Sequence, residues 1–218
     1  MKERGMIFNG EMVRAILDGR KTQTRRTIKW KQTRFTEIGE REDGSKWPWS
    51  EDAEHACDFW HPCPFGAVGD RIWVREAFRV HSRATDVATL VYKASERNSW
   101  TEQTHRVPVA VCNKPATPEK WTPSLHMPRW ASRILLEITD VRVERLNDIS
   151  EEDARAEGII DGGCLNCGEP EPCGCAKPEP DATDAFAYLW QSIYGQESWN
   201  ANPWVWVISF ERIEGGAA

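Results

Sequence analysis

The sequence has little that would direct the chain to a membrane or to secretion. No uninterrupted apolar run approaches the ~20 residues that a membrane-spanning helix needs. The start, Met1 to Arg4, leads into no hydrophobic signal segment. We therefore expect a cytoplasmic protein without a membrane partner. No internal repeat is visible, and 218 residues with 40% hydrophobic content suit one sizeable core, so a single domain over residues 1–218 is expected.

An overall excess of positive charge is also missing. The chain has 34 acidic and 28 basic residues, a net charge of −6, which argues against a protein that coats nucleic acid through global charge. Residues 1–34 nevertheless hold ten Lys or Arg against three acidic residues. A local basic site on an acidic chain suits a phosphate-bearing ligand better than long duplex DNA. The alternative is a solvated N-terminus rich in Lys and Arg.

The oxidising conditions that disulfides need are not expected in the cytoplasm, so the seven cysteines are candidate metal ligands or core residues. Four of them fall in a Gly- and Pro-rich segment of twelve residues: Cys164, Cys167, Cys173 and Cys175. Four thiolates at this spacing predict a structural zinc site, with no open position for water. The alternative is a loop without metal. A second, looser group consists of Cys57, His61 and Cys63.

Hydrophobic periodicity predicts an α+β fold. Strands are expected at residues 6–8, 71–78, 107–111, 134–143 and 204–212, and helices at 12–17, 150–158 and from 183. The strands are too many, and alternate too little with helices, for a parallel sheet. Residues 36–64 and 161–182 lack clear periodicity, and we interpret them as two loop insertions. In the strand at 71–78, alternation places Glu76 on the face of Ile72 and Val74, a carboxylate among apolar neighbours.

The first group of residues that could carry out a reaction follows the predicted N-terminal helix and extends from Gly19 to Arg26. Lys21 can act as a general base if burial or neighbouring cations lower its pKa. It could then take a proton from the Thr24 hydroxyl, which would attack an acyl carbon. In an ideal strand these two side chains point to opposite faces, so this interpretation requires a turn between them. The alternative is a basic surface loop.

The second group centres on Glu157, at the C-terminal end of the helix that begins after Ser150. The helix dipole disfavours a carboxylate there and tends to raise its pKa, which suits a general acid or base. The alternative is an exposed Glu at a frayed helix end.

Four segments form a recognisable pattern: residues 16–26, 69–74, 146–157 and 204–210. Together they resemble the ASCH family, whose domains are similar to the PUA-type RNA-binding barrels. Three shorter segments, residues 73–76, 126–129 and 202–204, look like a phage and prophage branch of that family. The resemblance covers residues 6–26, 66–80, 121–160 and 183–213, and leaves the two insertions outside.

The resemblance implies a small β-barrel with short flanking helices, and an activity like that of bacterial N-acetylcytidine amidohydrolases. It implies Thr24 as nucleophile, Lys21 as its base, and Glu157 as the acid–base group for the leaving amine or as the group that orients Lys21. Arg26 or backbone N–H groups near Gly19 are candidates for stabilising the oxyanion. Candidate substrate-binding residues are Arg20, Arg25, Arg26, Glu76, His126 and Arg129.

Three functions remain open from the sequence. The first is a hydrolase of a modified nucleoside or RNA base, most simply of an N-acylated cytidine. The second is a non-catalytic phage protein that binds RNA or a modified base with the same basic pocket and stacking Trp side chains, without needing the Thr24 hydroxyl. The third is a phage structural or regulatory protein that uses the barrel for interaction only. Glu76 is a rival catalytic carboxylate, with a structural ion pair to an Arg as its alternative role.

Overall fold

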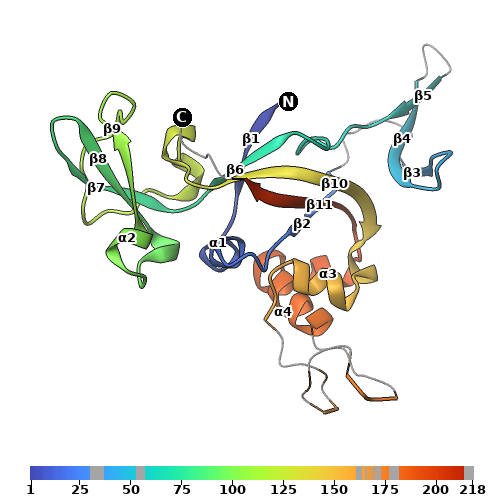
Figure 1. Cartoon of the computed structure of the whole chain (residues 1–218). Helices are drawn as coiled ribbons and strands as arrows, with labels where there is room; N and C mark the ends of the chain where they lie inside the picture. Colours follow the sequence, from blue (N-terminus) through green and yellow to red (C-terminus); the bar gives the residue numbers. More distant parts are fainter. Residues whose placement is uncertain are drawn as a thin grey trace. The chain divides into compact units, whose positions relative to one another are not determined.

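The computed structural model describes residues 1–29, 37–52, 57–160, 164, 166–167, 169, 173–176 and 182–213 (Figure 1). These residues form strands and helices in an α+β arrangement, which confirms the predicted class. Two compact units divide the chain: unit 1 holds Met1–Gly19, Gly69–Ile138 and Glu211–Ala218, and unit 2 holds Arg20–Val68 and Thr139–Phe210. The single-domain organisation stays a prediction. Within the described residues, no helix has the length and apolar character that crossing a membrane requires.

Strand β6 (Arg71–Arg75) is at the centre of the unit 1 part of a five-stranded sheet. Strand β1 (Glu3–Ile7) pairs with it in parallel, and the start of β10 (Leu135–Arg145) pairs with it antiparallel. Ile72 and Val74 of β6 are fully buried, as their alternation predicted. Strand β10 begins in unit 1 and ends in unit 2.

Helix α1 (Gly10–Leu17) follows β1, as the apolar spacing predicted. Its N-cap is Asn9, whose side chain accepts a hydrogen bond from the Met12 N–H at 2.8 Å. The helix stops because Gly19 adopts a left-handed conformation with φ of 75°, which glycine enters without the steric cost that a Cβ brings.

The second sheet of unit 1 is an antiparallel meander of β7 (Phe78–Arg83), β8 (Val87–Tyr92) and β9 (Thr104–Pro108). The strand predicted at 71–78 is therefore two strands, and the one predicted at 107–111 ends at Pro108. Strand β8 and the short helix α2 (Trp100–Gln103) were not predicted. The core of this part includes Phe78, Leu90, Tyr92, Val107 and Met127. Short 3₁₀ turns cover Lys93–Ser95, Ser124–His126, Arg129–Ala131 and, in unit 2, Leu146–Asp148.

The five-stranded sheet continues from β10 through β11 (Trp204–Ile213) to β2 (Gln23–Thr27). Strands β2 and β11 are antiparallel, with Thr24 opposite Ile208. The residues of β11 from Val205 to Ile208 are buried on both faces of the strand. Strand β2 is therefore held against an apolar partner, although its own sequence is polar.

Two helices, α3 (Glu151–Ala156) and α4 (Ala182–Tyr194), cover this core, and α5 (Gln196–Asn200) follows (Figure 1). Ser150 caps α3 as predicted, accepting from the Asp153 N–H at 3.1 Å. The Glu151 carboxylate accepts from the backbone N–H groups of Ala182 and Thr183, at 3.1 and 3.0 Å, so a residue of α3 also caps α4. The apolar residues beneath the pair include Leu146, Ile149, Phe186, Trp190, Val205 and Val207.

Residues 36–64, which we interpreted as a loop insertion, are not all loop. This segment contains an antiparallel sheet of β3 (Glu37–Glu40), β4 (Lys46–Asp52) and β5 (Cys57–Trp60). Trp47 and Trp49 lie two positions apart and therefore on one face of β4. Trp49 is paired with Trp60 of β5 across the strands, and the Trp47 ring packs edge-on against Trp206 at 4.9 Å. Aromatic pairs stabilise this sheet where aliphatic alternation is missing.

Strand pairing among the described residues gives open sheets and no closed barrel. The small barrel therefore stays a prediction. Much of the second predicted insertion, residues 161–182, lies outside the described residues, but α4 begins at Ala182, next to the predicted helix start at Thr183.

We expect Gly19→Ala to lower the free energy of unfolding by about 1 kcal/mol, because only the positive φ is at issue: no atom lies within 4 Å of an added Cβ. The matched control is Gly10→Ala, whose Cβ would meet only ordinary contacts at 3.5 and 4.0 Å, and which should change stability by less than about 0.5 kcal/mol. Urea denaturation measures both. Equal effects at the two positions would contradict the role of φ.

Candidate functional site

An almost completely buried charged pair in unit 2 joins Lys21, just before β2, to Glu157, the C-cap of α3. The Lys21 Nζ donates to the Glu157 Oε2 at 2.5 Å and to the Glu157 carbonyl oxygen at 2.9 Å. The backbones of the two residues also form an isolated antiparallel bridge. Lys21 is 2% and Glu157 4% exposed, so solvent water hardly hydrates either charged group. The structure thus unites two of the three predicted catalytic residues.

Burial lowers the pKa of Lys21, since the charged ammonium loses its hydration. The Glu157 carboxylate opposes this shift, while the charges of Arg26 and Arg25 add to it. A lysine of lowered pKa in contact with a carboxylate is suited to proton transfer. The same contacts also suit a purely structural ion pair, because a buried charge needs a partner wherever it lies.

Arg25 extends this pair into a network of carboxylates. Its side chain is fully buried, and its guanidinium contacts Glu157 at 3.4 Å, Glu144 at 3.1 Å and Asp153 at 2.9 Å. A planar guanidinium with several N–H donors can serve three carboxylates at once. The predicted substrate-binding role of Arg25 therefore competes with these three internal partners.

Sequence reasoning missed the outer part of the network. Arg142 of β10 contacts Glu144 at 2.5 Å and Asp153 at 2.9 Å. Burial alone would raise the pKa of Asp153, but Arg25 and Arg142 hold it below its usual value of 3.8. A signal was present in the sequence, since Arg142 and Glu144 are two residues apart and share one face of a strand.

Thr24, the predicted nucleophile, lies elsewhere on the strand. Gln23 and Arg25 reach α3, where the Gln23 amide donates to the Asp153 carbonyl oxygen at 2.9 Å. Side chains alternate along a strand, so Thr24 points to the opposite face of β2, where it is 1% exposed. Among the described residues, the Thr24 hydroxyl makes no hydrogen bond with Lys21 or Glu157.

Two other basic candidates flank the pair in unit 2. Arg20 donates to the Gly158 carbonyl oxygen at 2.8 Å, directly beyond Glu157. Arg26 is half-buried on β2, and its guanidinium donates to the Tyr194 hydroxyl at 3.1 Å. Tyr194 is 42% exposed, so Arg26 and this ring together form a solvent-accessible basic and aromatic surface.

Glu76 belongs to unit 1 and has a dedicated partner. Its carboxylate forms a two-pronged ion pair with Arg133, at 2.9 and 3.1 Å, and Arg133 also donates to the Ser95 hydroxyl and lies 4.0 Å from the centre of the Tyr92 ring. Burial raises the pKa of Glu76, and Arg133 opposes the shift. This geometry matches the alternative role of a structural ion pair.

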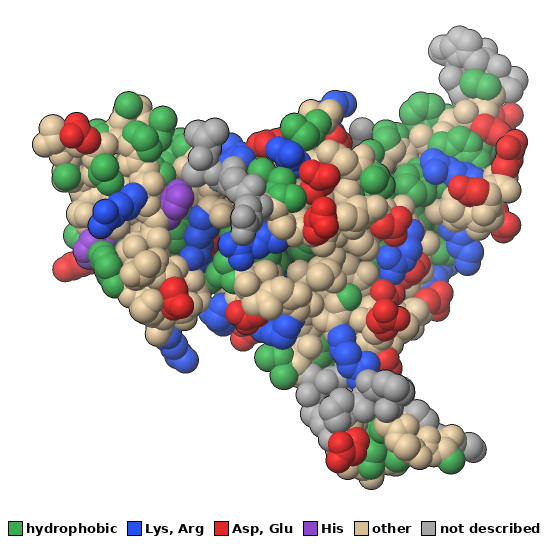
Figure 2. All heavy atoms as spheres, viewed as in Figure 1, with side chains coloured by type: hydrophobic (Ala, Val, Ile, Leu, Met, Phe, Trp, Pro, Cys, Tyr) green, Lys and Arg blue, Asp and Glu red, His purple; other side chains and the backbone are tan. Residues whose placement is uncertain are grey.

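The other two substrate-binding candidates also belong to unit 1. His126 is exposed at the end of a 3₁₀ turn, and Arg129 pairs with Glu3 at 2.9 Å. A cavity of about 940 Å³ in this unit is lined by Glu76 and Arg14 among others. Lys21, Thr24 and Glu157 belong to unit 2, so the predicted site residues are divided between the units. On the face shown in Figure 2, Lys and Arg are interspersed with Asp and Glu.

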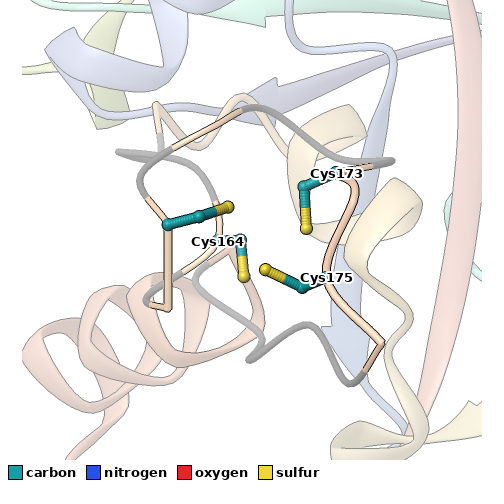
Figure 3. Close-up of side chains that lie close together, drawn as sticks. Cys164, Cys173 and Cys175 are labelled. Atoms are coloured by element: carbon teal, nitrogen blue, oxygen red, sulfur yellow. The ribbon is translucent and has the colours of Figure 1, made fainter.

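The four cysteines between α3 and α4 come together. The sulfur atoms of Cys164, Cys167, Cys173 and Cys175 lie within 4.8 Å of one another, close enough to bind one metal ion, and three of them are labelled in Figure 3. Hydrogen bonding with the Cys167 and Cys173 thiols raises the pKa of Cys175 to about 12. The looser predicted group of Cys57, His61 and Cys63 forms no such cluster among the described residues.

No family model, curated protein or solved structure matches the chain.

The stability losses from removing the two members of the buried pair should not add. Lys21→Met or Glu157→Gln leaves a buried group without its partner and should cost about 3–5 kcal/mol of unfolding free energy. The double variant should cost clearly less than the sum, with a coupling of about 1–3 kcal/mol in a urea-denaturation cycle. The control pair, Arg129 and Glu3, is about one-third exposed on both sides and should couple by less than about 1 kcal/mol. Additive effects at Lys21 and Glu157 would refute the buried pair.

Asp153 should make unit 2 sensitive to acid. Its pKa is below 3.8 in the folded chain, so at pH values under about 4 the unfolded state binds more protons, and stability falls as the pH falls. Asp153→Asn should be less stable at neutral pH and should lose less stability between about pH 4 and pH 2. Urea denaturation over this pH range tests it; parallel curves for parent and variant would rule out this contribution.

Proposed function

We propose that the chain hydrolyses an N-acyl group from a modified nucleoside or RNA base, most simply N-acetylcytidine, in the cytoplasm. The observation that carries the proposal is the buried contact between Lys21 and Glu157. Amide hydrolysis needs a base for the nucleophile and an acid for the leaving amine, and this contact places two groups able to exchange a proton side by side. The resemblance of the surrounding segments to ASCH amidohydrolases supports the same reaction.

In the proposed reaction, Lys21 first gives a proton to Glu157, and the Thr24 oxygen then adds to the acyl carbon while its own proton passes to the neutral Lys21 amine. The C–N bond then breaks, and the departing amine takes a proton from Lys21 or Glu157, leaving an ester on Thr24. Water hydrolyses this ester, with its proton returning through the same groups. Because Thr24 faces away from Gln23 and Arg25, substrate binding has to bring its hydroxyl within about 3 Å of Lys21 Nζ.

The proposal includes the ASCH-type barrel and a structural rather than catalytic role for the cysteine cluster. The order of β2, the Glu157 helix end and the closing strand β11 is compatible with that family's arrangement. Four thiolate ligands would leave a bound zinc without an open position for water, so the reaction is assigned to side chains alone.

A second function, binding of RNA or a modified base without catalysis, is favoured by one observation. The Thr24 hydroxyl has no hydrogen bond with the Lys21–Glu157 pair among the described residues, whereas Arg26 and the exposed Tyr194 offer a cation and a ring to a base. Base stacking on an aromatic ring contributes about 1–3 kcal/mol and needs no nucleophile.

Thr24→Ala separates the two functions. In a hydrolase it should bind N-acetylcytidine nearly as well as the parent but lose several orders of magnitude in turnover, because the nucleophile is gone. Release of cytidine, followed by chromatography, measures turnover, and calorimetry measures binding. The matched control is Thr27→Ala, on the same strand, which should keep parental turnover.

Two outcomes would overturn parts of the proposal. A parent chain that binds the nucleoside but releases no cytidine would be a binding protein without catalytic activity. Its affinity for the nucleoside should then fall in the variants Arg26→Met and Tyr194→Ala. Equal turnover by the parent and Thr24→Ala would remove Thr24 as nucleophile and leave a water activated by Glu157.

A further inference from the structure

The amino-acid composition of the cysteine segment, residues 161–181, offers little hydrophobic packing to hold its sulfur atoms together. Residues 161–181 include four Gly, four Pro and five Asp or Glu, and Leu165 is their only large aliphatic residue. Such a composition cannot build a hydrophobic core that would compensate for the entropy of ordering. Yet the four sulfur atoms lie within 4.8 Å of one another. A cross-linking group explains this convergence where hydrophobic packing cannot.

The local backbone presents the first two cysteines in a short turn. The Cys167 N–H donates to the Cys164 carbonyl oxygen at 3.2 Å, which folds the first pair into a turn. The Cys164 N–H donates to the Glu169 carbonyl oxygen at 2.9 Å, which brings the chain back past the first turn. Gly174 separates the second pair, and no atom lies within 4 Å of where its Cβ would be.

The geometry and the ligand chemistry point to one metal. We propose that Cys164, Cys167, Cys173 and Cys175 bind a single Zn²⁺ ion as a structural centre of unit 2. A tetrahedral zinc with bonds of about 2.3 Å separates its sulfur ligands by about 3.8 Å, which fits within the observed spacing. Four thiolates select zinc or iron over harder cations such as Mg²⁺ or Ca²⁺. All four cysteines are free of disulfides, so their sulfurs are available as ligands.

Burial places this centre at the surface. Cys164 is fully buried, Cys173 and Cys175 are partly exposed, and Cys167 is exposed. One sulfur therefore anchors the centre against the protein, while the others leave it open to ions and chelators in solution. The ion replaces a hydrophobic core for a segment that lacks one, as in other small metal-dependent elements.

Metal content and thiol protection test the proposal on the full chain. Protein reduced, exposed to equimolar Zn²⁺ and Fe²⁺ without oxygen, and then desalted should contain one zinc per chain by elemental analysis. Cys175→Ala should lose it, Cys175→His should retain it because imidazole is also a zinc ligand, and Cys57→Ala, outside the cluster, should keep one equivalent. Alkylation followed by mass spectrometry should find the four cysteines protected until EDTA is added.

Each other result overturns the proposal. Less than about 0.2 equivalents of zinc in fully reduced parent protein excludes the site, and one equivalent of iron replaces the assigned metal. Zinc retained in Cys175→Ala, with an unchanged circular dichroism spectrum, would place the metal elsewhere. The readouts involve no turnover, so their failure is distinct from a failure of the proposed hydrolysis.

Discussion

The contact between Lys21 and Glu157 is the constraint on which the local structure of unit 2 depends. Two charges that are almost completely removed from water are stable only with a close partner and further hydrogen bonds. The backbone bridge between these residues and the second hydrogen bond of Lys21 supply both. The start of β2 and the end of α3 are therefore fixed against each other at one point.

The rest of the network follows from that point. Once β2 is aligned with α3, alternation along the strand brings Gln23 and Arg25 to the helix, and Arg25 gathers Glu144, Asp153 and Glu157. The net arrangement is rigid because each ion has several partners, and a rigid site suits catalysis, which needs groups held in place before the substrate arrives. Because the network is rigid, Thr24 can approach Lys21 only if the bound substrate or a movement of the strand brings the two side chains together.

Local signals predicted the local structure well. The Gly19 turn, the Ser150 cap and the alternation around Ile72 and Val74 each depend on residues close in sequence, and each is confirmed. The structure brings Lys21 and Glu157 into contact, and these are two of the three residues that the resemblance to ASCH domains implied for one site. The sheet at residues 37–60 was missed because Trp pairs, and not aliphatic alternation, define its strands.

The site contacts that sequence analysis missed join residues far apart in the sequence. No periodicity indicates that Arg25 would meet Asp153 and Glu144, since this depends on how a strand and a helix far apart in the chain pack together. The position of Thr24 shows the converse. The sequence already indicated that Thr24 points to the strand face opposite to Gln23 and Arg25. Strand β2 keeps this regular alternation and lacks the turn that the nucleophile hypothesis required.

The hydrogen bonds from Ala182 and Thr183 to Glu151 bear on how long the connection between the two helices can be. They tie the first turn of α4 directly to the first turn of α3, whatever chain connects the two helices. Closing a longer connection costs little extra entropy, about 0.6 kcal/mol for each doubling of its length. The length of the intervening segment can thus change at little cost to the contact between the two helix starts.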